Sequence, residues 1–333
     1  MILNIKNKTR KYEVNVEGVN QWCGTNIIEK DMLLNIITKY FSKEKYREYD
    51  TKLECTIYSN EEELGRGYYT IYQIASREEL LSQLKIGKST YMLKYISNRV
   101  ISEYATMIHM EKISDELTNI YSHLNEEVFQ EFDNVELDFE VSKLFSIIQE
   151  SIISDKRGND IHNLSDFELI KNNIKLIEKL EISSENQVLI IIKNIDHLLT
   201  KEEYKKMYRL ATELSDITNM QFIFTLSVDG YCVVNENNIE KILVVNDDEI
   251  TLPKYEKLRE FVQNNYPINI EQNDKWFLEN LENCINRLGR SSEPVEITAE
   301  IILSIINKAI HVDYTKKFKV NKLTCKSKFR VKD

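Results

Sequence analysis

The segment Gly24-Thr25-Asn26-Ile27-Ile28-Glu29-Lys30-Asp31 joins an expected strand, Val19–Cys23, to an expected helix, Ile27–Phe41. Its first glycine, its spacing and its lysine match a phosphate loop, which reads G-x-x-x-x-G-K-[ST]. Two positions differ, because Glu29 replaces the second glycine and Asp31 replaces the hydroxyl residue that would hold Mg²⁺. Both changes oppose polyphosphate binding through charge and shape. The segment is either a relic of an ancestral nucleotide site or a chance Gly and Lys at a strand–helix turn. Neither interpretation predicts nucleotide hydrolysis.

A second feature of a nucleotide site follows the apolar run at residues 188–192. Asp196 comes shortly after this run, as the metal-holding acid follows an apolar strand in phosphate-loop enzymes. An acid at such a place also caps turns, so both interpretations stay open. Gly24, Lys30 and Asp196 are therefore the candidate residues of a degenerate nucleotide loop, which we do not expect to bind a nucleotide.

The segment Ile86-Gly87-Lys88-Ser89-Thr90 resembles the motif at first sight, but it lacks the first glycine and follows an amphipathic helix rather than a strand. We expect Gly87 to end one helix and Ser89 or Thr90 to cap the next.

Apolar strands and helices alternate on both sides of a long helical stretch. Strands are expected at residues 188–192, 222–226 and 242–245, and buried strands that alternate with helices form mostly parallel sheets. Residues 88–129 contain neither Gly nor Pro, which predicts one helix of roughly 60 Å.

These patterns predict an α/β protein in three parts. Residues 1–75 and 185–250 are expected to form one α/β domain with a mostly parallel sheet, which carries the degenerate phosphate loop. Residues 76–184 are expected to form an α-helical insertion in this domain. Residues 251–333 are expected to form a mainly helical C-terminal extension with a basic tail.

The composition excludes several classes of protein. Among 333 residues there are only 8 Gly and 3 Pro, which argues against collagen-like, linker-dominated and Gly/Pro-punctuated all-β chains. The longest apolar run has five residues, whereas about 20 are needed to span a bilayer. The five cysteines lack CxxC spacing, which argues against a disulfide framework and a zinc site. We therefore expect a cytoplasmic protein with no membrane partner.

The net charge of −10 is unevenly distributed. Removing eight cations of residues 314–332, a stretch without acids, leaves −18 on the rest of the chain. Cations at this density release counterions from a nucleic-acid backbone. The alternative is a solvated tail, or one bound to the protein's own acidic surface. The candidate DNA-binding residues of the tail are Lys316, Lys317, Lys319, Lys322, Lys326, Lys328, Arg330 and Lys332.

An acidic stretch without cations lies at residues 126–140. In it Glu136, Asp138 and Glu140 alternate with apolar residues, so an extended backbone would place three carboxylates on one side. Clustered carboxylates suit Ca²⁺, or Mg²⁺ with retained water. A solvated acidic connection between helices is the alternative.

The order of these parts resembles the CRISPR-associated adaptation protein of type II-A systems, in its large, C-terminally extended form. The resemblance covers roughly residues 1–250. It rests on the hairpin and degenerate loop, the helical insertion and the return to the sheet at Gln187–Lys193. The closest local likenesses are Asn134-Val135-Glu136-Leu137-Asp138-Phe139-Glu140, residues 188–192 with Asn194, and Thr200-Lys201-Glu202-Glu203.

The resemblance implies that residues 1–75 and 185–250 are a degenerate phosphate-loop, ATPase-like head without ATPase activity, and that residues 76–184 are an inserted α-helical leg domain. It also implies a homotetrameric ring whose basic channel threads the ends of linear double-stranded DNA. It implies a role in spacer acquisition beside the CRISPR integrase proteins and the RNA-guided effector nuclease. It also implies Ca²⁺ bound by acidic residues, which favours Glu136, Asp138 and Glu140. The leg-domain candidates for the channel, which no local motif ranks, are Lys85, Lys88, Lys94 and Arg99.

The leading hypothesis is therefore a non-enzymatic, ring-forming DNA-binding protein. Two alternatives remain. One is a divergent phosphate-loop ATPase that acts on nucleic acid through Lys30 and Asp196. The other is a protein-binding scaffold whose long helix forms an oligomer seam.

Overall fold

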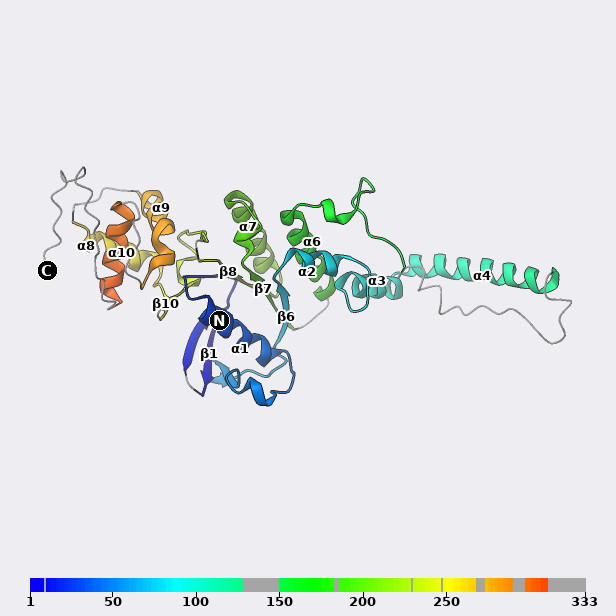
Figure 1. The fold of residues 1–333 in the computed structure, drawn as a ribbon, viewed down its shortest axis with the longest axis horizontal. Helices are drawn as coiled ribbons and strands as arrows, with labels where there is room; N and C mark the ends of the chain where they lie inside the picture. The colour runs from blue at the N-terminus through cyan, green and yellow to red at the C-terminus, as the bar shows by residue number, and fades with distance from the viewer. Residues whose placement is uncertain are drawn as a thin grey trace. The chain divides into compact units, whose positions relative to one another are not determined.

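The computed structural model describes residues 1–8, 10–127, 150–182, 186–228, 230–246, 248–267, 273–289 and 297–310. Its contacts divide the chain into two compact units (Figure 1). The first unit is Met1–Ala75 with Glu185–Asp333, and the second is Ser76–Ser184. The helices after residue 250 fall in the first unit, so the boundary expected at residue 250 stays a prediction.

The main sheet of the first unit has six strands in the part of the chain that the structure describes. Their order is β10-β9-β3-β8-β7-β6. All neighbours from β9 to β6 pair in parallel, and only β10 is antiparallel to its neighbour. The predicted mostly parallel sheet is confirmed. The strands are β3 (Val19–Cys23), β6 (Tyr69–Ile74), β7 (Gln187–Lys193), β8 (Met220–Thr225), β9 (Ile242–Val245) and β10 (Glu249–Thr251).

A smaller antiparallel sheet begins the chain. Its first two strands form the hairpin on which the resemblance rests, and two further strands that the sequence did not predict extend it in the order β2-β1-β4-β5. The unpredicted pair is short and lacks a buried apolar alternation. The strands are β1 (Ile2–Asn7), β2 (Lys11–Asn15), β4 (Cys55–Ser59) and β5 (Glu62–Glu63).

Helix α1 (Ile27–Phe41) lies between the two sheets. Its side chains Leu33, Ile36 and Ile37 are buried in one apolar cluster that also contains residues of both sheets. Helix α7 (Lys201–Ile217) covers the opposite face of the main sheet (Figure 1). There the ring of Tyr204 packs edge-on against Phe224 of β8, with 5.9 Å between the centroids. A capping box of Thr200 and Glu203 starts α7.

Three helices of the first unit follow the sheets, and the expected C-terminal helices are present. Their mutual packing buries apolar residues of each, among them Leu258, Phe277 and Leu303. The helices are α8 (Tyr255–Asn265), α9 (Asp274–Cys284) and α10 (Ile297–Ala309).

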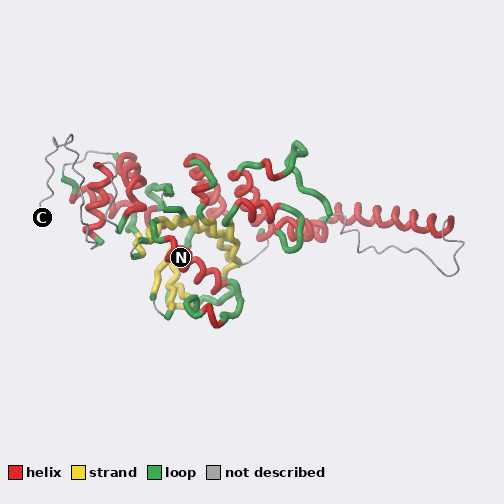
Figure 2. Tube along the Cα trace, in the orientation of Figure 1, coloured by secondary structure: helices red, strands yellow, loops and turns green. Residues whose placement is uncertain are grey.

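In the residues that the structure describes, the second unit consists of helices and loops, with one isolated β-bridge between Ser154 and Asp160 (Figure 2). Helix α6 packs against α2 and α3, and a capping box of Ser165 and Glu168 starts it. The helices described in this unit are α2 (Arg77–Leu84), α3 (Tyr91–Ser102), α4 (Tyr104–Glu127) and α6 (Asp166–Glu181).

The prediction of a single helix at residues 88–129 is wrong. The helical hydrogen-bond pattern is interrupted at Glu103, whose backbone is extended (φ −100°, ψ 103°). The packing differs on the two sides of the break: α3 packs on α6, whereas no described side chain of α4 is buried. No continuous packed face therefore holds the two helices in line. No helix among the described residues, the 24-residue α4 included, has the length and apolar character to cross a membrane.

Candidate functional site at the degenerate phosphate loop

The loop Gly24–Asn26 leaves β3 at the carboxyl edge of the main sheet and is tightly packed there. Gly24 has a φ of +94°, and a Cβ at this position would lie 2.3 Å from the carbonyl oxygen of Val245. Only glycine fits both the backbone angle and the contact. The first glycine of the motif is thus needed to bring the loop against β9.

The side chain of Asn246, which follows β9, fills the loop. Its Oδ1 accepts hydrogen bonds from the backbone N–H of Thr25 at 2.7 Å and from the Thr25 hydroxyl at 2.9 Å. The side-chain amide of Asn26 donates to the Asn246 carbonyl at 2.9 Å. Asn246 is 1% exposed, and its own amide donates to the carbonyls of Asn286 and Leu288. A neutral amide oxygen therefore takes donors that a phosphate loop offers to phosphate.

Lys30, the lysine of the motif, is 3% exposed and turned inward. Its ammonium donates to the carbonyl oxygens of Gly24 at 2.8 Å and Leu226 at 2.6 Å. Burial lowers the pKa of Lys30, and the neighbouring Cys23 and Asp196 oppose this only in part. The lysine ties the end of β3 to the end of β8 instead of facing solvent.

Asp196 lies at the same edge, in the turn after β7. Both carboxylate oxygens accept from the backbone N–H of Ser227 at 3.1 Å, and the Ser227 hydroxyl donates to Oδ2. A Cβ at Gly230 would lie 2.5 Å from the same Oδ2. The acid therefore caps the turn that follows β8, one residue beyond the carbonyl that Lys30 contacts.

Glu29 and Asp31 do not enter the loop. Glu29 accepts from Arg10 Nη1 at 2.9 Å and from the Tyr12 hydroxyl at 2.8 Å, which joins the start of α1 to the first hairpin. Asp31 is exposed on α1. The expectation that Glu29 places its charge in the phosphate cradle is wrong, because Arg10 draws the carboxylate away.

The second Gly-Lys-Ser segment lies between α2 and α3, as expected, but Gly87 does not end the helix, because α2 ends at Leu84 with Lys85 as its C-cap. Thr90 is the N-cap of α3, since its hydroxyl accepts from the backbone N–H of Leu93 at 3.3 Å. Ser89 has a φ of +70°. The segment is a helix break and not a phosphate site.

The four cations predicted on the second unit are all exposed. Lys85 lies 2.8 Å from Nε2 of His162, and Arg99 lies 3.7 Å from a carboxylate oxygen of Glu103. No ion pair to a described residue holds Lys88 or Lys94.

The other predicted site residues lie outside the described residues. These are the acidic set Glu136, Asp138 and Glu140 and the eight cations of the tail, Lys316 to Lys332. Within the ranges that the structure describes, no three His, Cys, Asp or Glu side chains come together to hold a metal.

The sequence did not point to Asn246, Ser227 or Asn286 as parts of this site. Asn286 donates to the Gly230 carbonyl and accepts from the Cys232 thiol at 3.7 Å. One signal was available for two of them, because Asn246 and Ser227 follow predicted strands closely, and the carboxyl ends of parallel strands share one edge.

Comparisons with known proteins agree with this fold. A family model described as CRISPR-associated protein Csn2, subfamily St, matches residues 5–327. The crystal structure of Stu0660 of Streptococcus thermophilus is similar with a TM-score of 0.81 and 23% identity, over 97% of this chain and 98% of that one. That likeness confirms the α/β fold.

Two nucleotide-binding structures are much less similar. The ATP-binding cassette MJ1267 of an ABC transporter in its ADP conformation has a TM-score of 0.38 at 13% identity, over 80% of this chain and 95% of its own. The recombination mediator protein RecF with ATP has a TM-score of 0.35 at 12% identity, over 75% of this chain and 98% of its own. No curated protein matches the chain. Because the family model spans nearly the whole sequence, the expected resemblance is confirmed and the chain belongs to the CRISPR-associated Csn2 family, subfamily St.

Proposed function

We propose that this Csn2-family chain is a non-enzymatic protein that assembles into a homotetrameric ring and binds the ends of linear double-stranded DNA during CRISPR spacer acquisition. Family membership supports the CRISPR role. The state of the phosphate loop supports the absence of hydrolysis. The exposed faces of the second unit support assembly and DNA contact.

The buried Lys30 is the observation that carries the non-hydrolytic part. Its ammonium already has two carbonyl partners, and Asp196 accepts three hydrogen bonds from Ser227. ATP would have to break these contacts and displace the Asn246 side chain from the backbone N–H of Thr25. We therefore expect no ATP turnover and no tight ATP binding.

Helix α4 supports self-assembly. Among the described residues no side chain of α4 is buried, although the helix carries apolar residues at helical spacing. Tyr104 is 78% exposed, and Met107, Ile113 and Ile120 are each about half exposed. An apolar face on a helix of about 36 Å suits packing against another copy of the chain. Symmetric copies would also gather the few cations onto one inner surface while the outside stays acidic.

DNA contact is assigned to exposed cations. Lys88 and Lys94 have no ion-pair partner among the described residues, while Lys85 and Arg99 have weak exposed neighbours that phosphate could replace. The tail cations stay candidates for the same role. Contacts of this kind read the phosphate backbone and weaken steeply as salt rises.

The metal and protein partners belong to the same proposal. Ca²⁺ would be held by Glu136, Asp138 and Glu140, whose carboxylates suit a hard cation. The CRISPR integrase proteins and the RNA-guided effector nuclease would be the protein partners. No nucleotide cofactor is part of the proposal.

Light scattering combined with a gel-shift assay tests ring assembly and end binding. We expect a mass of four chains, and affinity for a linear duplex well above that for the same sequence as a closed circle. The double variant Lys88→Ala/Lys94→Ala should weaken binding and reduce the salt slope by about 2. The matched control Lys205→Ala/Lys206→Ala removes two cations from α7. Equal affinity for linear and circular DNA would overturn the threading part.

Calorimetric titration with ATP and Mg²⁺ tests the non-hydrolytic part separately. We expect no binding heat. Tight binding that Lys30→Ala abolishes would instead favour the divergent ATPase.

A further inference from the structure

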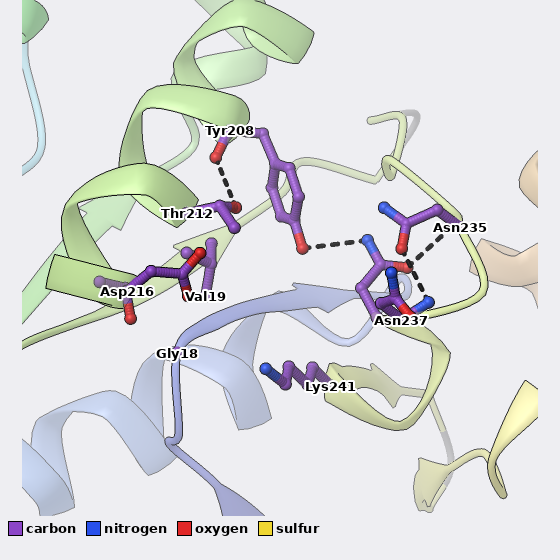
Figure 3. A pocket seen from close by; sticks show the side chains of 10 residues that line it. Gly18, Val19, Tyr208, Thr212, Asp216, Asn235, Asn237 and Lys241 are labelled. Atoms are coloured by element: carbon purple, nitrogen blue, oxygen red, sulfur yellow. Dashed lines mark hydrogen bonds between the residues drawn. The ribbon is translucent and has the colours of Figure 1, made fainter.

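A second polar site lies at the opposite edge of the main sheet, where β3 begins. A cavity of about 300 Å³ opens there between the start of β3, the last turns of α7 and the segment that leads into β9 (Figure 3). It is at the small end of the range for ligand sites. Its lining residues are Gly18, Val19, Tyr208, Thr212, Ser215, Asp216, Asn235, Asn237, Asn238 and Lys241.

Part of this lining forms a fixed frame. Asn238 is 3% exposed, and its side-chain amide donates to the Tyr208 hydroxyl at 3.0 Å and to the Val233 carbonyl at 2.8 Å. Its Oδ1 accepts from the backbone N–H of Asn235, and the Thr212 hydroxyl donates to the Tyr208 carbonyl. These bonds hold the wall of the cavity in place before any ligand arrives.

Four other polar side chains of the lining have no bonding partner among the described residues. Lys241, Ser215, Asp216 and Asn237 make no side-chain hydrogen bond and no ion pair with any described residue. They come from two different segments, and each is placed on the cavity. Asp216 and Asn237 are exposed and Ser215 and Lys241 are half-buried, so all four can contact a ligand in the cavity without breaking a bond within the protein.

Because Gly18 has no side chain, the ammonium of Lys241 can lie beside it. Its φ is +73°, and a Cβ there would lie 2.9 Å from Lys241 Nζ and 3.8 Å from Ser215 Oγ. Figure 3 shows the Lys241 side chain directed toward Gly18. The nearby Glu17 does not neutralise this ammonium, because the N-terminal ammonium binds Glu17 and is the main cause of its lowered pKa, with Lys241 a minor one.

We propose that this cavity binds a phosphorylated sugar, with the phosphomonoester on Lys241 and the sugar hydroxyls at the end of α7. A phosphate suits an ammonium that has no other partner. Asp216 and Ser215 lie in the last turn of α7, where the carboxylate and the free carbonyls favour hydroxyl donors and oppose an anion. A carboxylate that accepts from ribose hydroxyls is a known mode of sugar recognition. The charge separation therefore fixes the direction in which the ligand lies.

The same phosphomonoester could come from a free sugar phosphate or from the 5′ end of a DNA strand, whose terminal deoxyribose has no free hydroxyl for Asp216. Every residue of the site lies in the first unit, and none is among the predicted DNA-binding cations. The test therefore uses both sources as separate arms.

Isothermal titration of the full chain with ribose 5-phosphate is the first arm. We expect measurable binding that weakens at least tenfold in Lys241→Ala, while Lys206→Ala, which removes an exposed cation of α7 outside the cavity, leaves it unchanged. Asp216→Asn should weaken the binding of ribose 5-phosphate more than it weakens the binding of inorganic phosphate. A circular dichroism spectrum confirms that each variant is folded.

A short duplex with either a 5′-phosphate or a 5′-hydroxyl is the second arm. Binding of ribose 5-phosphate identifies a free ligand, whereas a preference for the phosphorylated duplex that Lys241→Ala removes identifies a DNA end. No binding in either arm, or equal binding by the native chain and Lys241→Ala, overturns the proposal.

Discussion

The two edges of the main sheet use their polar groups in opposite ways. At the carboxyl edge Lys30 and Asp196 are bonded to the protein itself, and the side chain of Asn246 occupies the loop. At the amino edge Lys241 and Asp216 face a cavity and have no partner among the described residues. The edge that carries the sequence motif is thus closed, and the edge without a motif is open.

This difference shows how a loop with the spacing of a phosphate loop keeps its fold without a ligand. The loop and the end of β8 keep their places because donors and acceptors of the protein itself hold them. Buried polar groups need such partners, since each one left unpaired costs about 1–3 kcal/mol. The motif residues that remain therefore serve stability, and a ligand can bind only where polar groups are spare.

The largest effect is expected from the glycines at the two ends of β3. Gly24→Ala should destabilise the protein by about 4 kcal/mol or more, because the new Cβ meets the Val245 backbone and the angle φ is unfavourable. Gly18→Ala should cost about 1–2 kcal/mol, because its Cβ meets only the flexible end of Lys241. Urea unfolding measures both. Equal losses would contradict the contrast between a closed and an open edge.

The next effect concerns a pair of asparagines. Asn246→Ala should cost about 2–3 kcal/mol, because it leaves the N–H of Thr25 and the Leu288 carbonyl without partners. It should also speed hydrogen exchange at Thr25. Asn237→Ala, at the open edge, should change the free energy of unfolding by less than about 0.5 kcal/mol. A comparable loss at Asn237 would mean that the open edge is also a structural element.

The periodicity of the sequence was enough to predict most of this fold. Helix α1 and strands β3 and β9 have the expected bounds, since buried apolar runs and caps are local signals. Strand β5 and the break at Glu103 were not predictable in this way. The first is a pair of exposed glutamates held by pairing with β4, and the second depends on where packing against α6 ends.

The sequence predicted residues of the candidate site but not the hydrogen bonds that they make. Gly24, Lys30 and Asp196 were named from spacing, and the structure brings all three to one edge. Whether Lys30 faces solvent or the interior depends on Leu226, almost two hundred residues away. Asn246 could not be assigned, because its partners come from both ends of the first unit. The amino-edge cavity carries no motif at all.

The lysines give a smaller contrast. Lys30→Met should cost about 2 kcal/mol, because the carbonyls of Gly24 and Leu226 lose their donor. Lys241→Met should leave the free energy of unfolding within about 0.5 kcal/mol of the native value, because its ammonium bonds to no described residue. Urea unfolding at pH 7 measures the free energy of unfolding of both variants. A loss at Lys241 as large as that at Lys30 would contradict the assignment of Lys241 to a ligand.

The smallest effect is the pH dependence that Lys30 contributes. Burial lowers the pKa of Lys30 in the folded protein below its ordinary value of 10.5. Between the two values the unfolded chain holds a proton that the folded chain has released, so the native free energy of unfolding rises with pH there, by at most about 1.4 kcal/mol per pH unit. Tyrosines titrate in the same range, but they are present in both proteins and cancel in the difference between the native chain and Lys30→Met. That difference, measured by urea unfolding from pH 7 to 10.5, should therefore grow toward high pH. A flat difference would mean that Lys30 keeps its proton as readily as a solvated lysine, and that the carboxyl edge is more open to water than its hydrogen bonds indicate.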